Sequence, residues 1–148
     1  MIRLCSVLCT VLLLGQLPTA SPLWAGDPLP EGRVHRVVMH LNSSDQQVQR
    51  GALNNIRNLY HELGPDTLAV ELVVHGAGLP LLVAKESMFA DDLAQLKREF
   101  GVLYTACSNT MAARGLSRAD LIDSVDRTVP AMVRLMELQE SRWSYIKP

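Results

Sequence analysis

Residues 68–78 read LAVELVVHGAG, and this segment gives the strongest indication of the fold class. The run from Leu68 to Val74 is rich in β-branched and apolar residues, and it lacks the sustained polar alternation of a strand with one face in water. Such runs are typical of strands that are buried on both faces of a parallel sheet. Glycines follow at once, so we predict a strand over 68–74 and a loop after it.

Two other stretches have the same character, at residues 34–41 and 102–106. Between the three, apolar residues recur every three or four positions, which is the spacing that puts them on one side of a helix. The two apolar stripes are Val48, Ala52, Ile56, Leu59 and Leu63, and then Phe89, Leu93, Leu96 and Phe100. Strands therefore alternate with helices along the chain.

Local signals mark the ends of these elements. Capping-box spacing occurs in Ser44 with Gln47 and in Ser117 with Asp120. Glycines stand where helices should stop, at Gly64, Gly101 and Gly115. A last helix is predicted from Pro130 to about Glu140, with short strands at 125–128 and 144–147 on either side of it. This order predicts a three-layer α/β/α fold with a mostly parallel sheet of about five strands.

The first 25 residues differ from the rest of the chain. Arg3 is followed by a mainly apolar, uncharged run from Leu4 to Leu17, and prolines end it. This is the pattern of a secretory signal peptide, and the run is shorter than the about 20 residues that a spanning helix needs. We predict a signal peptide over 1–25 with cleavage after Ala25, or alternatively after Ala20. The domain would occupy 26–148, in the periplasm, with no membrane contact after signal removal.

The charge balance argues against a nucleic-acid partner. The chain has 14 Lys and Arg against 15 Asp and Glu, and one basic residue, Arg3, leaves with the signal, so the domain carries a net charge of −2. Basic residues are scattered among acidic ones, as at 97–99, whereas proteins that bind phosphate backbones carry basic clusters.

Cysteine usage singles out one residue. Cys5 and Cys9 fall in the predicted signal, so Cys107 is alone in residues 26–148 and has no partner for an internal disulfide. A strand ends at Cys107 and a helix is predicted to begin within two residues, with Ser108 or Asn109 as its cap. Backbone N–H groups at such a turn favour a thiolate. A reactive thiol and an inert buried side chain both remain open at this point.

The loop after the first quoted strand is the second candidate for chemistry, because ligands gather at the carboxyl ends of parallel strands. Gly76 and Gly78 allow a tight turn and a close approach of the backbone to a ligand or a neighbouring segment. His75 is either a proton donor and acceptor at that edge or a hydrogen-bonded residue that shapes the loop.

Other sites are not indicated. Dinucleotide, phosphate-loop, HExxH and GxSxG patterns do not occur, and we expect no cofactor. His35 and His40 lie five positions apart on a predicted strand, which sends them to opposite faces, so we expect no metal site. Met132 and Met136 are expected to belong to a core stripe.

Taken together, these motifs resemble the DsrE/DsrF-like family over nearly the whole of residues 26–148. The motifs that carry the resemblance are His75-Gly76-Ala77-Gly78-Leu79, Phe100-Gly101-Val102, Ala106-Cys107-Ser108-Asn109-Thr110-Met111, Gly115-Leu116, Val129-Pro130 and Tyr145-Ile146-Lys147-Pro148. The resemblance implies a five-stranded α/β/α fold, frequent homo-oligomers and a role in sulfur metabolism. It also implies that Cys107 carries sulfane sulfur, that Asn109 and Thr110 shape its turn, and that His75 and Gly76 line the opposite loop.

Two functions follow as hypotheses. The first is an exported, sulfurtransferase-like sulfur carrier that takes sulfur from a sulfane donor onto Cys107 and passes it to an acceptor thiol. The second is a small-molecule-binding or oligomeric interaction module without covalent chemistry. A redox sensor is a minor third, since any resolving cysteine would come from another chain.

Overall fold

Residues 34–148 are described by a computed structural model, and they form a five-stranded sheet in which every strand pair is parallel. The strand order is β4-β3-β2-β1-β5. The strands are β1 (His35–Leu41), β2 (Leu68–Val74), β3 (Leu103–Cys107), β4 (Arg127–Val129) and β5 (Ser144–Ile146). The predicted signal peptide over 1–25, with Cys5 and Cys9, lies outside the described residues.

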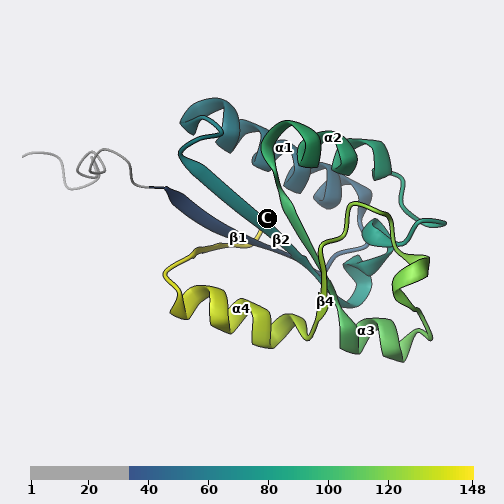
Figure 1. The fold of residues 1–148 in the computed structure, drawn as a ribbon. Coiled ribbons are helices and arrows are strands. Elements are labelled where there is room, and N and C mark those ends of the chain that lie inside the picture. Colours follow the sequence, from purple (N-terminus) through teal and green to yellow (C-terminus); the bar gives the residue numbers. More distant parts are fainter. Residues whose placement is uncertain (1–33) are drawn as a thin grey trace, which may run out of the picture. The chain divides into compact units, whose positions relative to one another are not determined.

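Helices cover both faces of the sheet, which confirms the predicted three-layer α/β architecture. Figure 1 shows α1 and α2 on one face and α4 on the other. The helices are α1 (Gln46–Leu63), α2 (Ala90–Phe100), α3 (Ser108–Ala113) and α4 (Ala131–Glu140), with 3₁₀ turns η1 (Gly76–Leu82) and η2 (Arg118–Asp120). The chain builds β1 to β4 side by side, and α4 then returns across the sheet so that β5 pairs with β1. Within residues 34–148, no helix is long and apolar enough to cross a membrane.

Each face of the sheet packs its own apolar cluster. Val70, Leu72 and Val74 of β2 belong to the larger cluster, under α1 and α2. Val73 belongs to the smaller one under α4, which consists of Val38, Val73, Cys107, Ala131, Leu135 and Leu138. Since successive side chains of a strand point to opposite faces, both faces of β2 are buried, as the unbroken apolar run predicted.

Several predicted boundaries are confirmed and others are corrected. Gly64 and Gly101 end α1 and α2, and Ser117 with Asp120 forms the capping box of η2. The cap of α1 is Asp45 rather than Ser44, because the Asp45 side chain accepts from the backbone N–H of Gln47 and Val48. Neither Ser108 nor Asn109 caps α3, since Cys107 itself occupies the cap position.

The apolar stripe of α1 is wider than predicted: Ala52 and Ile56 are buried and Val48 and Leu59 pack against the core, as expected, but Leu63 does not. Its buried residues are Gln49, Ala52, Leu53, Ile56 and Tyr60, whereas Leu63 is 36% exposed. The stripe of α2 is as predicted, with Phe89, Leu93 and Leu96 buried. Tyr60 takes the place expected for Leu63 because its ring stacks on Phe100 of α2, with ring centroids 4.6 Å apart.

Gly78 brings η1 against the loop that follows β1. A Cβ atom at this position would lie 3.1 Å from both the carbonyl oxygen of Leu41 and the Cα of Asn42. Backbone atoms cannot turn aside as a side chain can, so Gly78→Ala is expected to lower the free energy of unfolding by about 2 kcal/mol. Urea denaturation measures this change.

Gly51→Ala is the matched control, because Gly51 lies within α1 and a Cβ there meets nothing within 4 Å. This variant is expected to gain about 0.5–1 kcal/mol, since alanine is the better helix former. Equal stability of the two alanine variants would contradict the close approach at Gly78.

Candidate functional site

Cys107 is the last residue of β3, and α3 begins directly after it. Its side chain faces α4, where it packs in the smaller apolar cluster and is 6% exposed. The backbone N–H of Ala131, the first residue of α4, donates to the Cys107 Sγ at 3.4 Å. The sulfur is therefore held where the beginnings of two helices meet.

Polar donors around the sulfur favour its ionised form. Burial raises the pKa of the Cys107 thiol, but hydrogen bonds from the N–H of Ala131, from the hydroxyl and N–H of Thr110, and from the N–H of Asn109 outweigh it. The net result is a pKa below the ordinary thiol value. A lowered thiol pKa is the condition for a nucleophilic cysteine near neutral pH.

The two candidate loops of the sequence meet at this edge of the sheet. The backbone N–H of Gly76 donates to the Thr110 Oγ1 at 3.0 Å, which joins the turn after β2 to α3. Because its oxygen accepts this bond, the Thr110 hydroxyl proton is free to point at the sulfur. Asn109 is exposed, so only its backbone contributes to the sulfur site. The predicted residues Cys107, Thr110 and Gly76 thus form one cluster.

His75 belongs to a line of side chains that the sequence did not reveal. The Nε2 atoms of His75 and His40 are 2.6 Å apart, and the His40 Nδ1 lies 2.6 Å from the Tyr145 hydroxyl oxygen. One imidazole therefore carries the shared proton and the other accepts it. His40 lies on the face of β1 that carries Val38, whereas His35 lies on the face of Val37 and Met39, so the two histidines point to opposite faces as predicted.

The only signals for this line were His40 at the end of a strand and Tyr145 in a predicted terminal strand. Their contact depends on β5 pairing with β1, which no local pattern indicates. The three residues come from β5, β1 and the end of β2, which are adjacent in the sheet, and β3 with Cys107 is the next strand. The line therefore runs along the strand ends toward the cysteine.

The surroundings of both rings favour the neutral imidazole over its protonated form. Burial, followed by the positive charges of His75 and Lys147, lowers the pKa of His40 from its ordinary value of 6.5. Burial and Lys147 likewise lower the pKa of His75. The unfolded chain therefore binds more protons than the folded chain once the pH drops below 6.5.

This difference in proton binding predicts how the stability of the protein changes with pH. The contribution of these two histidines to the free energy of unfolding is expected to be at its full value above pH 6.5 and to be lost as the pH falls through the lowered histidine pKa values. Urea denaturation at a series of pH values measures it. His40→Gln/His75→Gln should flatten this decrease, whereas His61→Gln, at an exposed site on α1, should keep it. An unchanged slope in the double variant would contradict the assignment.

A groove of about 450 Å³ runs beside α4 and reaches His40 and Tyr145. Met132 and Met136 line it and are 57% and 52% exposed, so the expectation that they belong to a core stripe is wrong. The inward side of α4 is instead formed by Ala131, Leu135 and Leu138. Residues 132 and 136 lie one position further round the helix, which turns them toward solvent.

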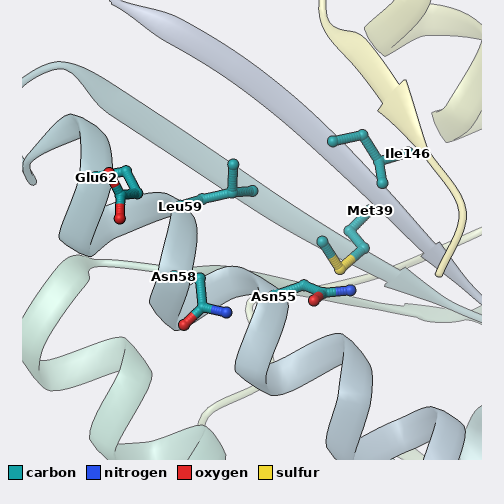
Figure 2. Close-up of a pocket in the computed structure, with 6 residues that line it drawn as sticks. All are labelled: Met39, Asn55, Asn58, Leu59, Glu62 and Ile146. Atoms are coloured by element: carbon teal, nitrogen blue, oxygen red, sulfur yellow. The ribbon is translucent and has the colours of Figure 1, made fainter.

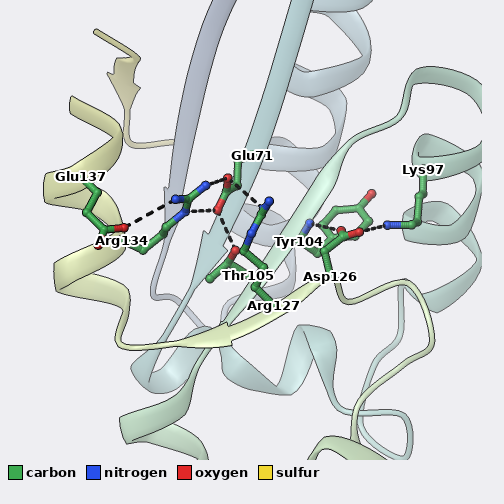
Figure 3. A network of polar contacts seen from close by, with 8 residues as sticks. All are labelled: Glu71, Lys97, Tyr104, Thr105, Asp126, Arg127, Arg134 and Glu137. Carbon is green, nitrogen blue, oxygen red and sulfur yellow. Dashed lines mark hydrogen bonds and ion pairs between the residues drawn. The ribbon is translucent and has the colours of Figure 1, made fainter. Parts of the chain in front are cut away.

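A buried ionic network lies on the face of the sheet that α4 covers, and Figure 3 shows its members. Glu71 of β2 is fully buried and accepts from Thr105 Oγ1 at 2.7 Å, from Arg134 Nε at 2.8 Å and Nη2 at 2.7 Å, and from Arg127 Nη1 at 3.3 Å. Burial raises the pKa of Glu71, but hydrogen bonds from Arg134 and Thr105 and the charges of Arg134 and Arg127 hold it below its usual value.

A second hollow, of about 300 Å³, lies on the opposite face, between α1 and the edge formed by β1 and β5 (Figure 2). Its lining is Met39, Asn55, Asn58, Leu59, Glu62 and Ile146, none of which is a predicted site residue. Among residues 34–148, no group of three or more His, Cys, Asp and Glu side chains is arranged to hold a metal ion.

No protein-family model matches the chain, and no curated protein sequence matches it significantly. Among solved structures, the chain is similar to MTH1491 from Methanobacterium thermoautotrophicum, a protein of unknown function, with 30% identity and a TM-score of 0.71 over 77% of this chain and 99% of MTH1491. YchN from E. coli has 17% identity and a TM-score of 0.63 over 78% of this chain and 100% of YchN. At this level of identity, the similarity shows a shared fold only.

Both of these proteins have the DsrE-like fold that the motifs led us to expect. The similarity to MTH1491 extends over nearly all of that protein. The chain therefore belongs to the same family as MTH1491, a family of α/β proteins with the DsrE-like fold.

Proposed function

We propose that the chain is a sulfur carrier of the DsrE/DsrF-like type, which holds sulfane sulfur as a persulfide on Cys107. One observation carries the proposal: the buried Cys107 sulfur is met by the N–H of Ala131 at 3.4 Å and by donors from Thr110 and Asn109. Such donors stabilise the negatively charged sulfur of the thiolate, which is the form of Cys107 that attacks the donor.

The proposed reaction is an exchange of sulfur without net oxidation. In loading, the Cys107 thiolate attacks the outer sulfur of a donor such as thiosulfate. A new S–S bond forms on Cys107, the S–S bond of the donor breaks, and sulfite leaves with the electron pair. In unloading, an acceptor thiolate attacks the outer sulfur of the persulfide, and Cys107 leaves as the thiolate.

The proposed setting is the periplasm, and the apolar run from Leu4 to Leu17 supports it. The proposed partners are a sulfane-sulfur donor, an acceptor thiol and further copies of the same chain. The last of these rests on the resemblance to the DsrE/DsrF-like family, in which homo-oligomers are frequent.

Intact-protein mass spectrometry tests the proposal directly. Incubation of the purified protein with polysulfide or thiosulfate is expected to add the mass of one sulfur atom, and a reductant is expected to remove it. Peptide mapping should place the added mass on the peptide that contains Cys107. A folded protein that gains no mass with either donor would overturn the carrier function.

One observation favours a second candidate, a binding module without covalent chemistry. Cys107 is 6% exposed and packs with apolar residues, while the groove of about 450 Å³ beside α4 is open to solvent. Under this function the thiol is part of the core and the groove holds the ligand. A thiol that resists iodoacetamide in the folded protein, and reacts only in urea, would favour the binding module over the carrier.

A further inference from the structure

Glu71 joins the three elements that surround Cys107. Its partners Thr105 and Arg127 lie opposite each other on β3 and β4, and the next pair on the same face is Cys107 opposite Val129. Residues two apart on a strand point to the same side of the sheet. The charged network thus lies one step below the sulfur, on the face that α4 covers.

The third element is α4, which Arg134 ties to the same carboxylate. Arg134 uses Nε and Nη2 to reach both oxygens of Glu71, and such a two-point contact fixes direction as well as distance. Arg134 also lies in the first turn of α4, three residues after Ala131, whose N–H meets the sulfur. The position of Arg134 along the axis of α4 therefore bears on where the Ala131 N–H lies relative to the sulfur.

Apolar packing alone does not fix the position of α4 along its axis. Leu135 and Leu138 hold α4 on the sheet, but burial of apolar surface is non-directional and allows a helix to slide. The Ala131 N–H is 3.4 Å from the sulfur, so a shift of α4 along its axis by a fraction of a turn would remove the contact. The ion pair is a directional restraint against such a shift, in addition to the pairing of Val129 with Cys107 just before α4 begins.

We propose that Glu71 and Arg134 are a positioning pair for Cys107, which holds the start of α4 in the place along its axis where the Ala131 N–H stabilises the sulfur anion. This inference rests on the proposed function of Cys107 as a nucleophile, and it identifies what keeps that nucleophile in its reactive state. Neither residue touches the sulfur; both act through α4.

The test measures the rate of iodoacetamide alkylation of Cys107 against pH, in the full chain with Cys5→Ser/Cys9→Ser so that one thiol reacts. Glu71→Met/Arg134→Met removes the pair without leaving one charge buried alone. The midpoint of the profile is expected to move to higher pH, and the rate at pH 7, relative to the high-pH plateau, to fall roughly fivefold. Altered access to the thiol changes the plateau and leaves the midpoint in place.

Two further variants complete the test. Arg57→Met removes an ion pair with Asp92 on the other face of the sheet and should leave the profile unchanged. Arg134→Lys keeps the charge but loses the two-point contact, so a shift of the midpoint smaller than that of the double variant is expected. If the double variant does not fold, Arg134→Lys serves as the test of the positioning pair. A folded variant of the pair with the parental midpoint overturns the inference. Alkylation needs no sulfur donor, so this test is independent of sulfur loading. If the midpoint shifts but the protein never loads sulfur, the carrier function is wrong and the positioning role of the pair stands.

Discussion

Cys107→Ser is expected to lose sulfur loading completely. Serine presents a hydroxyl that cannot form a persulfide, and Cys107 is the one cysteine in the described residues. The fold should survive, because a hydroxyl at this position can still accept the hydrogen bond from the Ala131 N–H, and the stability change should stay within about 1 kcal/mol. Mass spectrometry after incubation with polysulfide measures the loss, with urea denaturation as the check on folding.

The matched control is Cys5→Ser/Cys9→Ser, which keeps Cys107 and should load as much sulfur as the parent chain. Retention of the sulfur adduct in folded Cys107→Ser would place the chemistry elsewhere and would refute the carrier role of this residue. Loss of the adduct in the control instead would move that role to the first ten residues of the chain.

Arg134→Met is expected to lower the free energy of unfolding by about 3 kcal/mol, which is the typical cost of leaving a buried charge without its main partner. Glu71 has no exposed surface, and it would keep the Thr105 hydroxyl and the more distant Arg127. These remaining partners put the expected loss at the low end of the usual range. Urea denaturation with linear extrapolation measures it.

Removal of both Glu71 and Arg134 should lower the free energy of unfolding by less than removal of Arg134 alone. In Glu71→Met/Arg134→Met, apolar side chains replace the pair, and most of the lost stability should return. Arg114→Met provides the control on the surface, since Arg114 and Glu86 are 34% and 37% exposed and such pairs contribute less than about 1 kcal/mol. An Arg134→Met variant as stable as Arg114→Met would show that α4 does not depend on Glu71.

The fold could be predicted from the sequence because its signals are local. The apolar run 68–74 became β2 without change of bounds, and Gly64 and Gly101 ended the helices that they were predicted to end. The junction at Cys107 could also be predicted, since a strand that stops before a helix start brings unpaired N–H groups to the thiol wherever it occurs. Even the face of His40 followed from counting residues along a strand.

Which side chains of the site act together depends on how distant segments pack, and this could not be predicted from the sequence. His40 and Tyr145 are 105 positions apart and meet because β5 returns to the free side of β1. In the sequence, Glu71 is a single polar residue within an apolar run. Its ion-pair partners, Arg127 of β4 and Arg134 of α4, reach it only in the folded chain. Met132 and Met136 faced outward because α4 turned a different stripe to the sheet. The periodicity of apolar residues indicates which side of each segment is buried. Strand order and the rotation of each helix depend on the packing of the whole chain. The polar contacts of the site depend on strand order and helix rotation, so periodicity does not predict them.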